Sequence, residues 1–323
     1  MNKLFKFMII IIVHILITGC SFKESKPKRF KVGIINLTPT LEPLVKSFKK
    51  NLQDFGYIEN NNISYIYNGY IKKNQNIDEK VNNLLKQKVD LILSISTKAS
   101  LIVKKHTSDK NVPVLFAPVS YPVESGLVKT LRRPEYNLTG IRGDGYIRKA
   151  LEWLIKVIPD LKKIYVPYNP VDISMTGSLK ELNKAALNRN IELQIVTVKS
   201  NHDVLEALDN IPEDVQAIWE LASYYWGPYV KKFINASIKH KKALMTITYE
   251  WTEMGAMISF GGHSSVIGKQ AGRLAHKILK GISPSVIPVE QADFYLTINL
   301  HTAKSIGVSI NKNILKHADF IIR

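Results

Sequence analysis

The chain is nearly without cysteine, since its 323 residues include one, at position 20. A lone cysteine excludes an internal disulfide framework. The eight histidines never stand at metal-ligand spacing from one another or from Cys20. The sequence therefore predicts neither a metal site nor another bound cofactor.

Long hydrophobic runs and catalytic motifs are also missing. Behind the first 20 residues no segment approaches the roughly 20 apolar residues of a membrane span. There is no G-x-S-x-G elbow, no Walker loop and no G-x-G-x-x-G after the first expected strand. The stretch Gly261-Gly262-His263 indicates a tight turn, because two adjacent glycines are a weak sign of a phosphate loop. We expect a protein that is not an enzyme.

The single cysteine follows an ordered N-terminal signal. Lys3 and Lys6 are positive, residues 7–17 are almost wholly apolar, and the small residues Thr18-Gly19 precede Cys20. This order resembles a bacterial lipobox, in which the cysteine is acylated and becomes the new N-terminus. We expect residues 1–19 to be a lipoprotein signal peptide and the polar, basic residues 20–29 to be a lipidated tether. The alternative is an inert cysteine in an uncleaved anchor.

Acidic residues are outnumbered by basic ones, and the formal charge is +18. Removing residues 1–19, which contribute two lysines and no acid, leaves +16. Nucleic acid could explain such a balance. The lysines are spread through every segment, however, with no arginine-rich arm and no RNA-binding aromatic motif. A solvated basic surface is favoured over a nucleic-acid partner, and anionic lipid headgroups near the tether could add to anchoring.

From residue 30 onward, short apolar runs alternate with patterns of helical period. In 41–55 the apolar residues share one helix face, and Gly56 follows where a C-cap glycine would stand. The expected strands of this first set are 31–37, 63–67, 90–96, 112–119 and 137–141, and the helices are 41–55, 77–88 and one ending at Val103.

The same alternation restarts after residue 146. Near-continuous apolar strands between helices are typical of parallel sheets covered on both faces. We therefore expect an α/β protein of two doubly wound parallel-sheet lobes, with a ligand cleft between them at the carboxyl ends of the strands. The expected strands of this second set are 163–168, 191–198, 215–221 and 243–249, and the helices are 147–158, 177–188, 204–211 and 229–240.

Hydroxyl, amide and aromatic side chains follow the expected strands in both lobes. Each one alone is well explained as a helix cap, but their convergence on one sheet edge favours ligand binding. Hydroxyls and helix N-termini would receive an anionic group, and aromatic rings would stack on a planar or apolar one. The candidate ligand-binding residues are Asn36, Thr38, Ser96, Thr97, Ser120 and Tyr121, followed by Tyr168, Asn169, Ser174, Ser223, Tyr224 and Glu250.

A series of short sequence motifs occurs in order along both lobes. Through these motifs the sequence, from about Lys31 to the C-terminus, resembles the tryptophan/tyrosine-type family of ABC transporter substrate-binding proteins. No string is diagnostic alone, but their order and spacing are specific. They include Phe55-Gly56-Tyr57, residues 90–97 and 112–119, Asn137-Leu-Thr-Gly140, Tyr168-Asn-Pro170, Gly268-Lys-Gln-Ala-Gly272 and Ile306-Gly-Val308.

The resemblance implies a type I periplasmic-binding-protein fold with three hinge strands. Lobe 1 would comprise 30–141 plus 255–281, and lobe 2 would comprise 142–254 plus 282–323. A monomer, exported and held at a bacterial membrane by its lipid, would pass a small ligand to an ABC permease and its ATPase. Two alternatives remain: a ligand sensor that feeds a membrane partner such as a histidine kinase and, more weakly, an exported enzyme.

Two departures from the family bear on the ligand. Many relatives read Thr-Asp-Pro where this chain has Ser120-Tyr121-Pro122, and they often carry an aspartate at the position of Ser223. Such acids are natural partners of an amino-acid ammonium. Glu250, or Asp144 and Asp172, could take over that role. Otherwise the ligand carries no ammonium and is an organic anion or a neutral aromatic compound.

Overall fold

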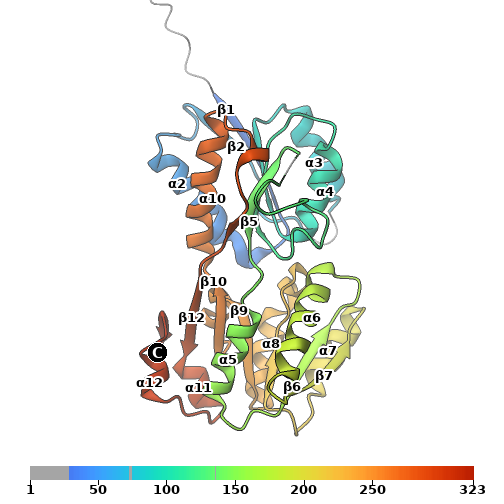
Figure 1. The fold of residues 1–323 in the computed structure, drawn as a ribbon, viewed down its shortest axis with the longest axis vertical. Coiled ribbons are helices and arrows are strands. Elements are labelled where there is room, and N and C mark those ends of the chain that lie inside the picture. Colours follow the sequence, from blue (N-terminus) through green and yellow to red (C-terminus); the bar gives the residue numbers. More distant parts are fainter. Residues whose placement is uncertain (1–28, 73–74, 135) are drawn as a thin grey trace, which may run out of the picture.

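The protein forms two lobes stacked along its longest axis (Figure 1). This computed structural model describes residues 29–72, 75–134 and 136–323. The expected signal peptide, Cys20 and nearly all of the tether lie outside the described residues. Each lobe contains one β-sheet, as the alternating sequence pattern predicts.

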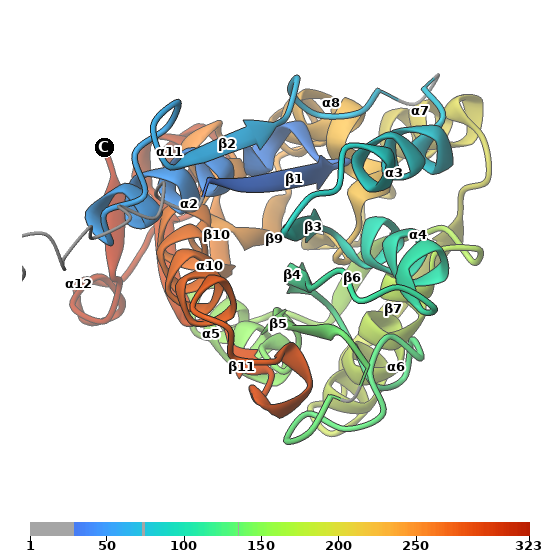
Figure 2. The ribbon, with the colours of Figure 1, turned by 90° about the horizontal axis from the view of Figure 1, so that it is seen from above.

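The first lobe is built on a six-stranded sheet of order β11-β5-β4-β3-β1-β2, in which every pair is parallel. Neighbouring side chains on a strand face opposite ways, so Ile34 packs with α2 and α10 while Ile35 packs with α3 and α4 (Figure 2). Its elements are β1 (Phe30–Asn36), η1 (Pro39–Leu41), α2 (Glu42–Asp54), β2 (Ile63–Ile66), α3 (Ile77–Lys86), β3 (Leu91–Ile95), α4 (Thr97–Thr107), β4 (Val114–Val119), β5 (Leu138–Arg142), α10 (Ser264–Leu279), η3 (Pro284–Val286) and β11 (Glu290–Gln291).

The second lobe has a seven-stranded sheet of order β13-β12-β10-β9-β8-β6-β7. All its pairs are parallel except β10 with β12. Its elements are α5 (Ile147–Val157), β6 (Lys163–Tyr168), α6 (Ile173–Leu187), β7 (Glu192–Thr197), α7 (Asn201–Asp209), β8 (Ala217–Trp219), η2 (Tyr224–Tyr229), α8 (Val230–Lys239), β9 (Ala243–Thr248), α9 (Tyr249–Glu253), β10 (Ile258–Gly262), β12 (Phe294–Asn299), α11 (Leu300–Ser305), α12 (Lys312–Leu315) and β13 (Phe320–Ile322).

The chain passes between the two sheets three times, after β5, after β10 and after β11. The crossings differ from the expected lobe boundaries at two places. Strand β10 lies in the segment 255–281 expected in lobe 1, yet it pairs within the second sheet. Strand β11 lies in the segment expected in lobe 2, yet it pairs with β5 in the first sheet. Both strands lie next to a crossing, where hydrophobic pattern alone does not assign a sheet.

Helices α2 and α10 pack unusually closely on the outer face of the first sheet (Figure 2). A Cβ built on Gly268 would lie 2.7 Å from Ser47 Cβ and against the Leu44 carbonyl. One on Gly272 would lie 2.6 Å from Asn51 Oδ1. The two glycines of the Gly268–Gly272 string are therefore needed because the neighbouring helix leaves no room for a side chain.

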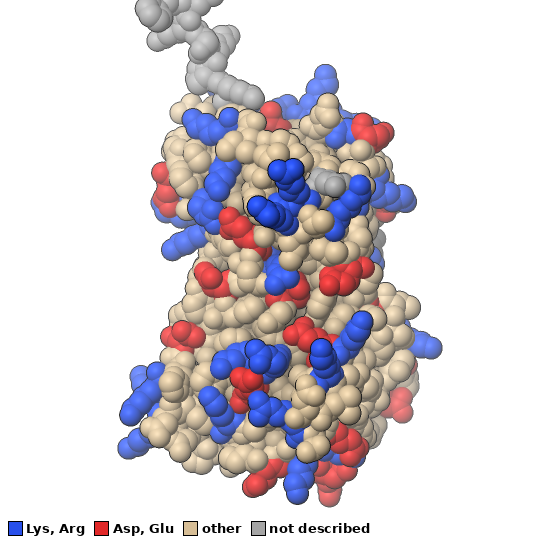
Figure 3. All heavy atoms as spheres, viewed as in Figure 1, with Lys and Arg blue, Asp and Glu red and all other residues tan. Residues whose placement is uncertain are grey.

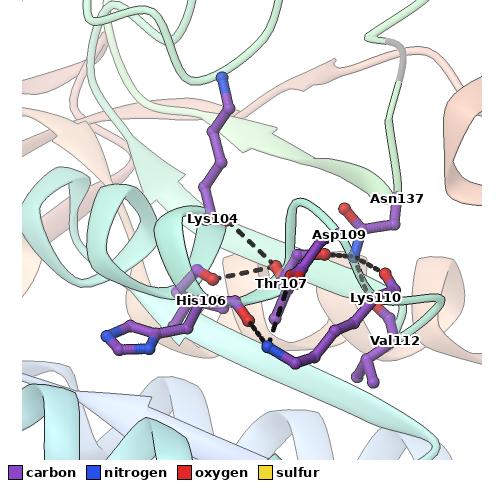
Figure 4. Close-up of polar contacts among 8 residues, drawn as sticks. Lys104, His106, Thr107, Asp109, Lys110, Val112 and Asn137 are labelled. Atoms are coloured by element: carbon purple, nitrogen blue, oxygen red, sulfur yellow. Dashed lines mark hydrogen bonds and ion pairs between the residues drawn. The ribbon is translucent and has the colours of Figure 1, made fainter.

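Asn137, the first residue of the string Asn137-Leu-Thr-Gly140, has a structural role at the end of the first lobe that points away from the second lobe. The Asn137 side-chain amide donates to the carbonyls of Thr107, Lys110 and Val112, closing the loop between α4 and β4 (Figure 4). Lys110 Nζ, in the same loop, donates to the carbonyl of His106 in the last turn of α4 at 2.9 Å. A surface depression of about 510 Å³ adjoins this loop. It lies at the amino ends of β4 and β5, so it is separate from the edge where the lobes meet.

Lysine and arginine side chains are scattered over both lobes in the face that Figure 3 presents, without forming one basic stripe. Exposed ion pairs such as Lys50 with Asp54 and Lys239 with Asp209 break up the positive surface. Within the described residues, every helix falls short of the length or the hydrophobicity that a bilayer-spanning segment requires.

We expect Gly268→Ala to lower the free energy of unfolding by about 1–3 kcal/mol, because the added methyl group meets backbone that cannot move away. Lys269→Ala on the exposed side of α10 should change it by less than about 0.5 kcal/mol. Urea unfolding followed by circular dichroism measures both. Equal stability of the two variants would contradict the close approach of α2 and α10.

Candidate ligand site between the lobes

Polar groups from both sheets line a small chamber where the lobes meet. Its volume is about 90 Å³, and we call it the inner chamber. Because the strands of both sheets end here, each lobe contributes the residues that follow its strands. The first lobe lines it with Thr38, Thr40, Leu41, Ser96, Thr97, Pro118 and Ser120, and the second with Ser174, Glu220, Ala222, Ser223, Tyr224, Ile247, Thr248 and Trp251.

In the first lobe the hydroxyls cap a helix and line the chamber at once. Ser96 is the N-cap of α4, and its hydroxyl accepts from Ala99 N at 3.3 Å. Thr97 Oγ1 accepts from Ser120 N at 3.2 Å, which ties the ends of β3 and β4 together. The two interpretations of these residues, capping and ligand binding, are therefore compatible. The positive end of the α4 dipole lies at the same point.

In the second lobe Asp172 organises the corresponding edge. It is the N-cap of α6 and accepts from Ser174 N at 2.9 Å. The Ser223 hydroxyl donates to the other Asp172 carboxylate oxygen and accepts from Tyr225 N. Because of this cap, α6 begins at Ile173, four residues before the helix that the sequence predicts. Asp172 thus holds two hydroxyl residues in place at the chamber wall.

Glu220 is the acid that lines the inner chamber, and it directly follows β8. It is 3% exposed. One carboxylate oxygen accepts from Ile247 N at a long 3.4 Å. No lysine, arginine or histidine is among the described residues that line the chamber. Burial without a compensating charge raises the pKa of Glu220 to about 8, so the carboxyl group is mainly protonated at neutral pH.

A larger and mostly apolar chamber of about 820 Å³ adjoins the inner one; we call it the outer chamber. Ser174 and Tyr224 line both chambers, so the two are neighbours. Asn169 and Asp172 also border the outer chamber. Aromatic and aliphatic side chains form most of its wall, namely Leu37, Tyr70, Ile71, Ile77, Leu101, Ile102, Val171, Ile173, Tyr225, Pro228 and Tyr229, and Lys72, Lys98 and Lys199 stand among them.

Direct contacts join the lobes beside the chambers. Lys98 Nζ, on α4, donates to Tyr224 Oη at 2.9 Å. Tyr121, after β4, donates its hydroxyl to Glu181 Oε2 on α6 at 2.7 Å. The Tyr121 ring packs against Gly177, and a Cβ atom built on that glycine would lie only 2.6 Å from the ring. These contacts hold the two walls of the chambers against each other.

The structure brings seven of the predicted site residues to the inner chamber and one more, Asn169, to the outer chamber. The seven are Thr38, Ser96, Thr97, Ser120, Ser174, Ser223 and Tyr224. Tyr121 is not among the residues that line either chamber, because its side chain contacts α6 instead. Asn36 and Tyr168 also face neighbours in their own lobes. The Asn36 amide donates to Glu42, and Tyr168 Oη lies 3.1 Å from Thr176 Oγ1.

Two predicted acids lie at chain crossings rather than at the chamber walls. Asp144 follows β5, and its carboxylate lies 3.6 Å from Arg142 Nη1. Burial raises the pKa of Asp144, and the Arg142 charge opposes that rise. Glu250, 5% exposed, accepts from Ser264 N at 3.0 Å where the chain enters α10. Burial raises the pKa of Glu250. A ligand role for either acid stays a prediction.

Sequence reasoning missed Glu220 and the wall of the outer chamber. Glu220 stands inside residues 215–221, which the sequence pattern predicts to be a buried strand. A charged residue within an otherwise buried run is the available signal, since such a residue is rarely buried without purpose. The loop residues Tyr70 and Ile71 carry no periodic pattern that would assign them to a site.

Comparisons with known proteins agree with this architecture. A family model described as ABC transporter substrate binding protein matches residues 31–322. The tyrosine-binding protein of Clostridioides difficile is 27% identical over 310 residues, covering 91% of this chain and 88% of its own. The crystal structure of a conserved domain protein from Vibrio cholerae is 25% identical, with a TM-score of 0.83, and the match covers 92% of this chain and 100% of that chain. A domain from Streptococcus pneumoniae in complex with L-Trp gives 22% identity and a TM-score of 0.81, covering 91% and 100%.

We expect Glu220→Gln to change the pH dependence of stability. The folded protein binds a proton at Glu220 that the unfolded chain releases near pH 4.5, so Glu220 destabilises the fold as pH rises toward about 8. The variant lacks this loss. Relative to wild type it should gain roughly 4 kcal/mol between pH 5 and pH 9, measured by urea unfolding without ligand. The buried acids Asp144 and Glu250 also make stability depend on pH, but their contributions are the same in wild type and variant and cancel in the difference. Parallel curves over this range would contradict the burial of Glu220.

Proposed function

Because the chain belongs to the family of ABC transporter substrate-binding proteins, we propose that it is the solute-binding lipoprotein of an ABC importer. It captures a small molecule outside the cytoplasm and delivers it to a permease and its ATPase. The lipid on Cys20 and the tether 20–29 hold the two lobes near that permease. No catalytic step is part of this proposal.

The observation that carries the proposal is the inner chamber. Its wall comes from the strand ends of both sheets, and three chain crossings connect those sheets. A solute seated there contacts both lobes, so its binding favours the arrangement in which the lobes are close. A hinge motion of this kind turns ligand occupancy into a shape that a permease can recognise.

The two chambers together indicate an amphipathic ligand. The inner chamber offers hydroxyls and a carboxyl group to a polar head, while the outer chamber offers tyrosine rings and aliphatic side chains to an apolar or aromatic body. Tyrosine, the ligand named for the Clostridioides difficile relative, has this character. We propose an aromatic, amino-acid-like solute for the present protein.

Ligand binding should draw the lobes together. We expect small-angle scattering with saturating L-tyrosine, or with the solute that the purified protein retains, to give a smaller radius of gyration than the ligand-free protein. The reason is that a bound solute adds contacts to both lobes only in the closed arrangement. An unchanged radius at proven saturation would argue against a clamp.

Lipidation should depend on Cys20. We expect Cys20→Ser to shift the protein from the membrane fraction to the soluble fraction of the producing bacterium, because serine has no sulfur to acylate. Immunoblots of separated fractions measure this, with Ser21→Ala as the matched control that stays in the membrane. Membrane retention of Cys20→Ser with residues 1–19 intact would indicate an uncleaved anchor.

A further inference from the structure

Glu220 is a buried acid at the wall of a ligand chamber, and within the part of the chain that the structure describes it forms no ion pair. Its carboxyl group has one protein donor, Ile247 N at 3.4 Å. No basic residue lies among the described residues around that chamber. Acids in protein interiors are almost always paired, and an unpaired one at a ligand site indicates that the ligand supplies the partner.

The described titratable groups packed around Glu220 include a tyrosine, three acids and one lysine, and the lysine ammonium already has a protein partner. Tyr146, at the N-cap of α5, is buried, and burial followed by the charges of Tyr121 and Glu220 raises its pKa. Glu181 on α6 is bonded to Tyr121, and Asp172 before α6 is bonded to Ser223. On α9 Glu250 is bonded to Ser264 N. From the first lobe, the Lys98 ammonium is bonded to Tyr224 Oη, and Tyr224 lines both chambers.

Hydroxyl groups face Glu220 from the opposite side of the chamber. Ser96, Thr97 and Ser120 belong to the first lobe, whereas Glu220 belongs to the second. A solute with a cationic end and an anionic end would therefore meet a carboxylate on one lobe and hydrogen-bond donors on the other. Such a solute bridges the lobes, which is what a clamp requires.

We propose that Glu220 binds the ammonium group of the solute, which makes the ligand a primary amine and the second lobe the side that recognises its cationic end. The inference rests on the proposed function and adds the chemical class of the head group. A charge-assisted hydrogen bond within the closed chamber orients the amine. Analogues that lack the amine should bind more weakly, because they cannot form this hydrogen bond.

Binding then requires the loss of one proton. At neutral pH the free site holds Glu220 mainly as the neutral acid. The solute arrives as an ammonium ion, the carboxyl group becomes a carboxylate that accepts from it, and the carboxyl proton goes to water. With a free-site pKa of about 8, roughly 0.9 proton should leave per ligand at pH 7, and the number should fall as the pH rises through 8.

Isothermal titration calorimetry of the wild-type full-length protein in two buffers of different ionisation enthalpy counts this proton. The probes are L-tyrosine and L-tryptophan, compared with their amine-free analogues 3-(4-hydroxyphenyl)propionate and indole-3-propionate. We expect the amines to bind with proton release at pH 7 and at least about 100-fold tighter than the analogues. Amine binding with no released proton overturns the proposal, as does equal affinity for the amine-free analogues.

Variants separate Glu220 from a general effect of charge. Glu220→Gln is nearly isosteric and should lose at least about 100-fold in affinity for the amines together with the proton release. Glu220→Asp should keep part of the amine affinity and part of the proton release. Glu206 is an exposed acid on α7, and Glu206→Gln should leave the affinity and the proton release unchanged. Thermal unfolding verifies that each variant is folded, and the wild-type proton count stands without them. Full amine affinity in Glu220→Gln overturns the proposal.

The experiment also distinguishes this inference from the proposed function. If an amine-free solute alone binds and closes the lobes, solute capture stands and the ammonium role of Glu220 is wrong. If mass spectrometry finds no retained small molecule and none of the probes binds, both are wrong. Amine binding that depends on Glu220 supports both.

Discussion

The common direction of the parallel strands is the constraint on which the rest of this structure depends. In a parallel sheet all carboxyl ends lie at one edge, and here the two sheets present those edges to each other. Residues far apart in sequence, such as Ser96 and Ser223, therefore meet at one chamber. Helices start at the same edge, so their capping hydroxyls become wall residues without any change of local structure.

Burial at that edge gives the chamber its selectivity. A carboxyl group such as Glu220 would be worth little on the surface, because water screens it, but inside the closed chamber an unpaired charge is costly. The same burial that raises its pKa makes a matching ammonium strongly favourable. The fold carries this cost in the form of stability lost at high pH, which is a common exchange at binding sites.

Much of the fold could be predicted from sequence because strand and helix periods are local signals. The strand after residue 30, the helix ending before Gly56 and the restart near residue 147 all reflect such periods. The sheet membership of β10 and β11 could not be predicted, since it depends on where a chain crossing falls. In the site, the hydroxyls were found because they follow strands. Glu220 was missed because pattern reasoning treats an acid within an apolar run as part of the strand, and the contact of Tyr121 with α6 depends on how the lobes meet.

The contacts between the lobes determine how much of the free energy of closure the ligand must supply. Tyr121 with Glu181 and Lys98 with Tyr224 join the lobes through protein groups alone. Each contributes only modestly, because both pairs are partly solvated. A clamp closed mainly by its own contacts would respond little to solute, whereas one closed mainly by solute depends on groups that only the solute can satisfy. Glu220 is such a group, since its carboxyl has one long protein hydrogen bond. The weak contacts between the lobes and the incompletely hydrogen-bonded carboxyl group of Glu220 together favour a closure that depends on bound solute.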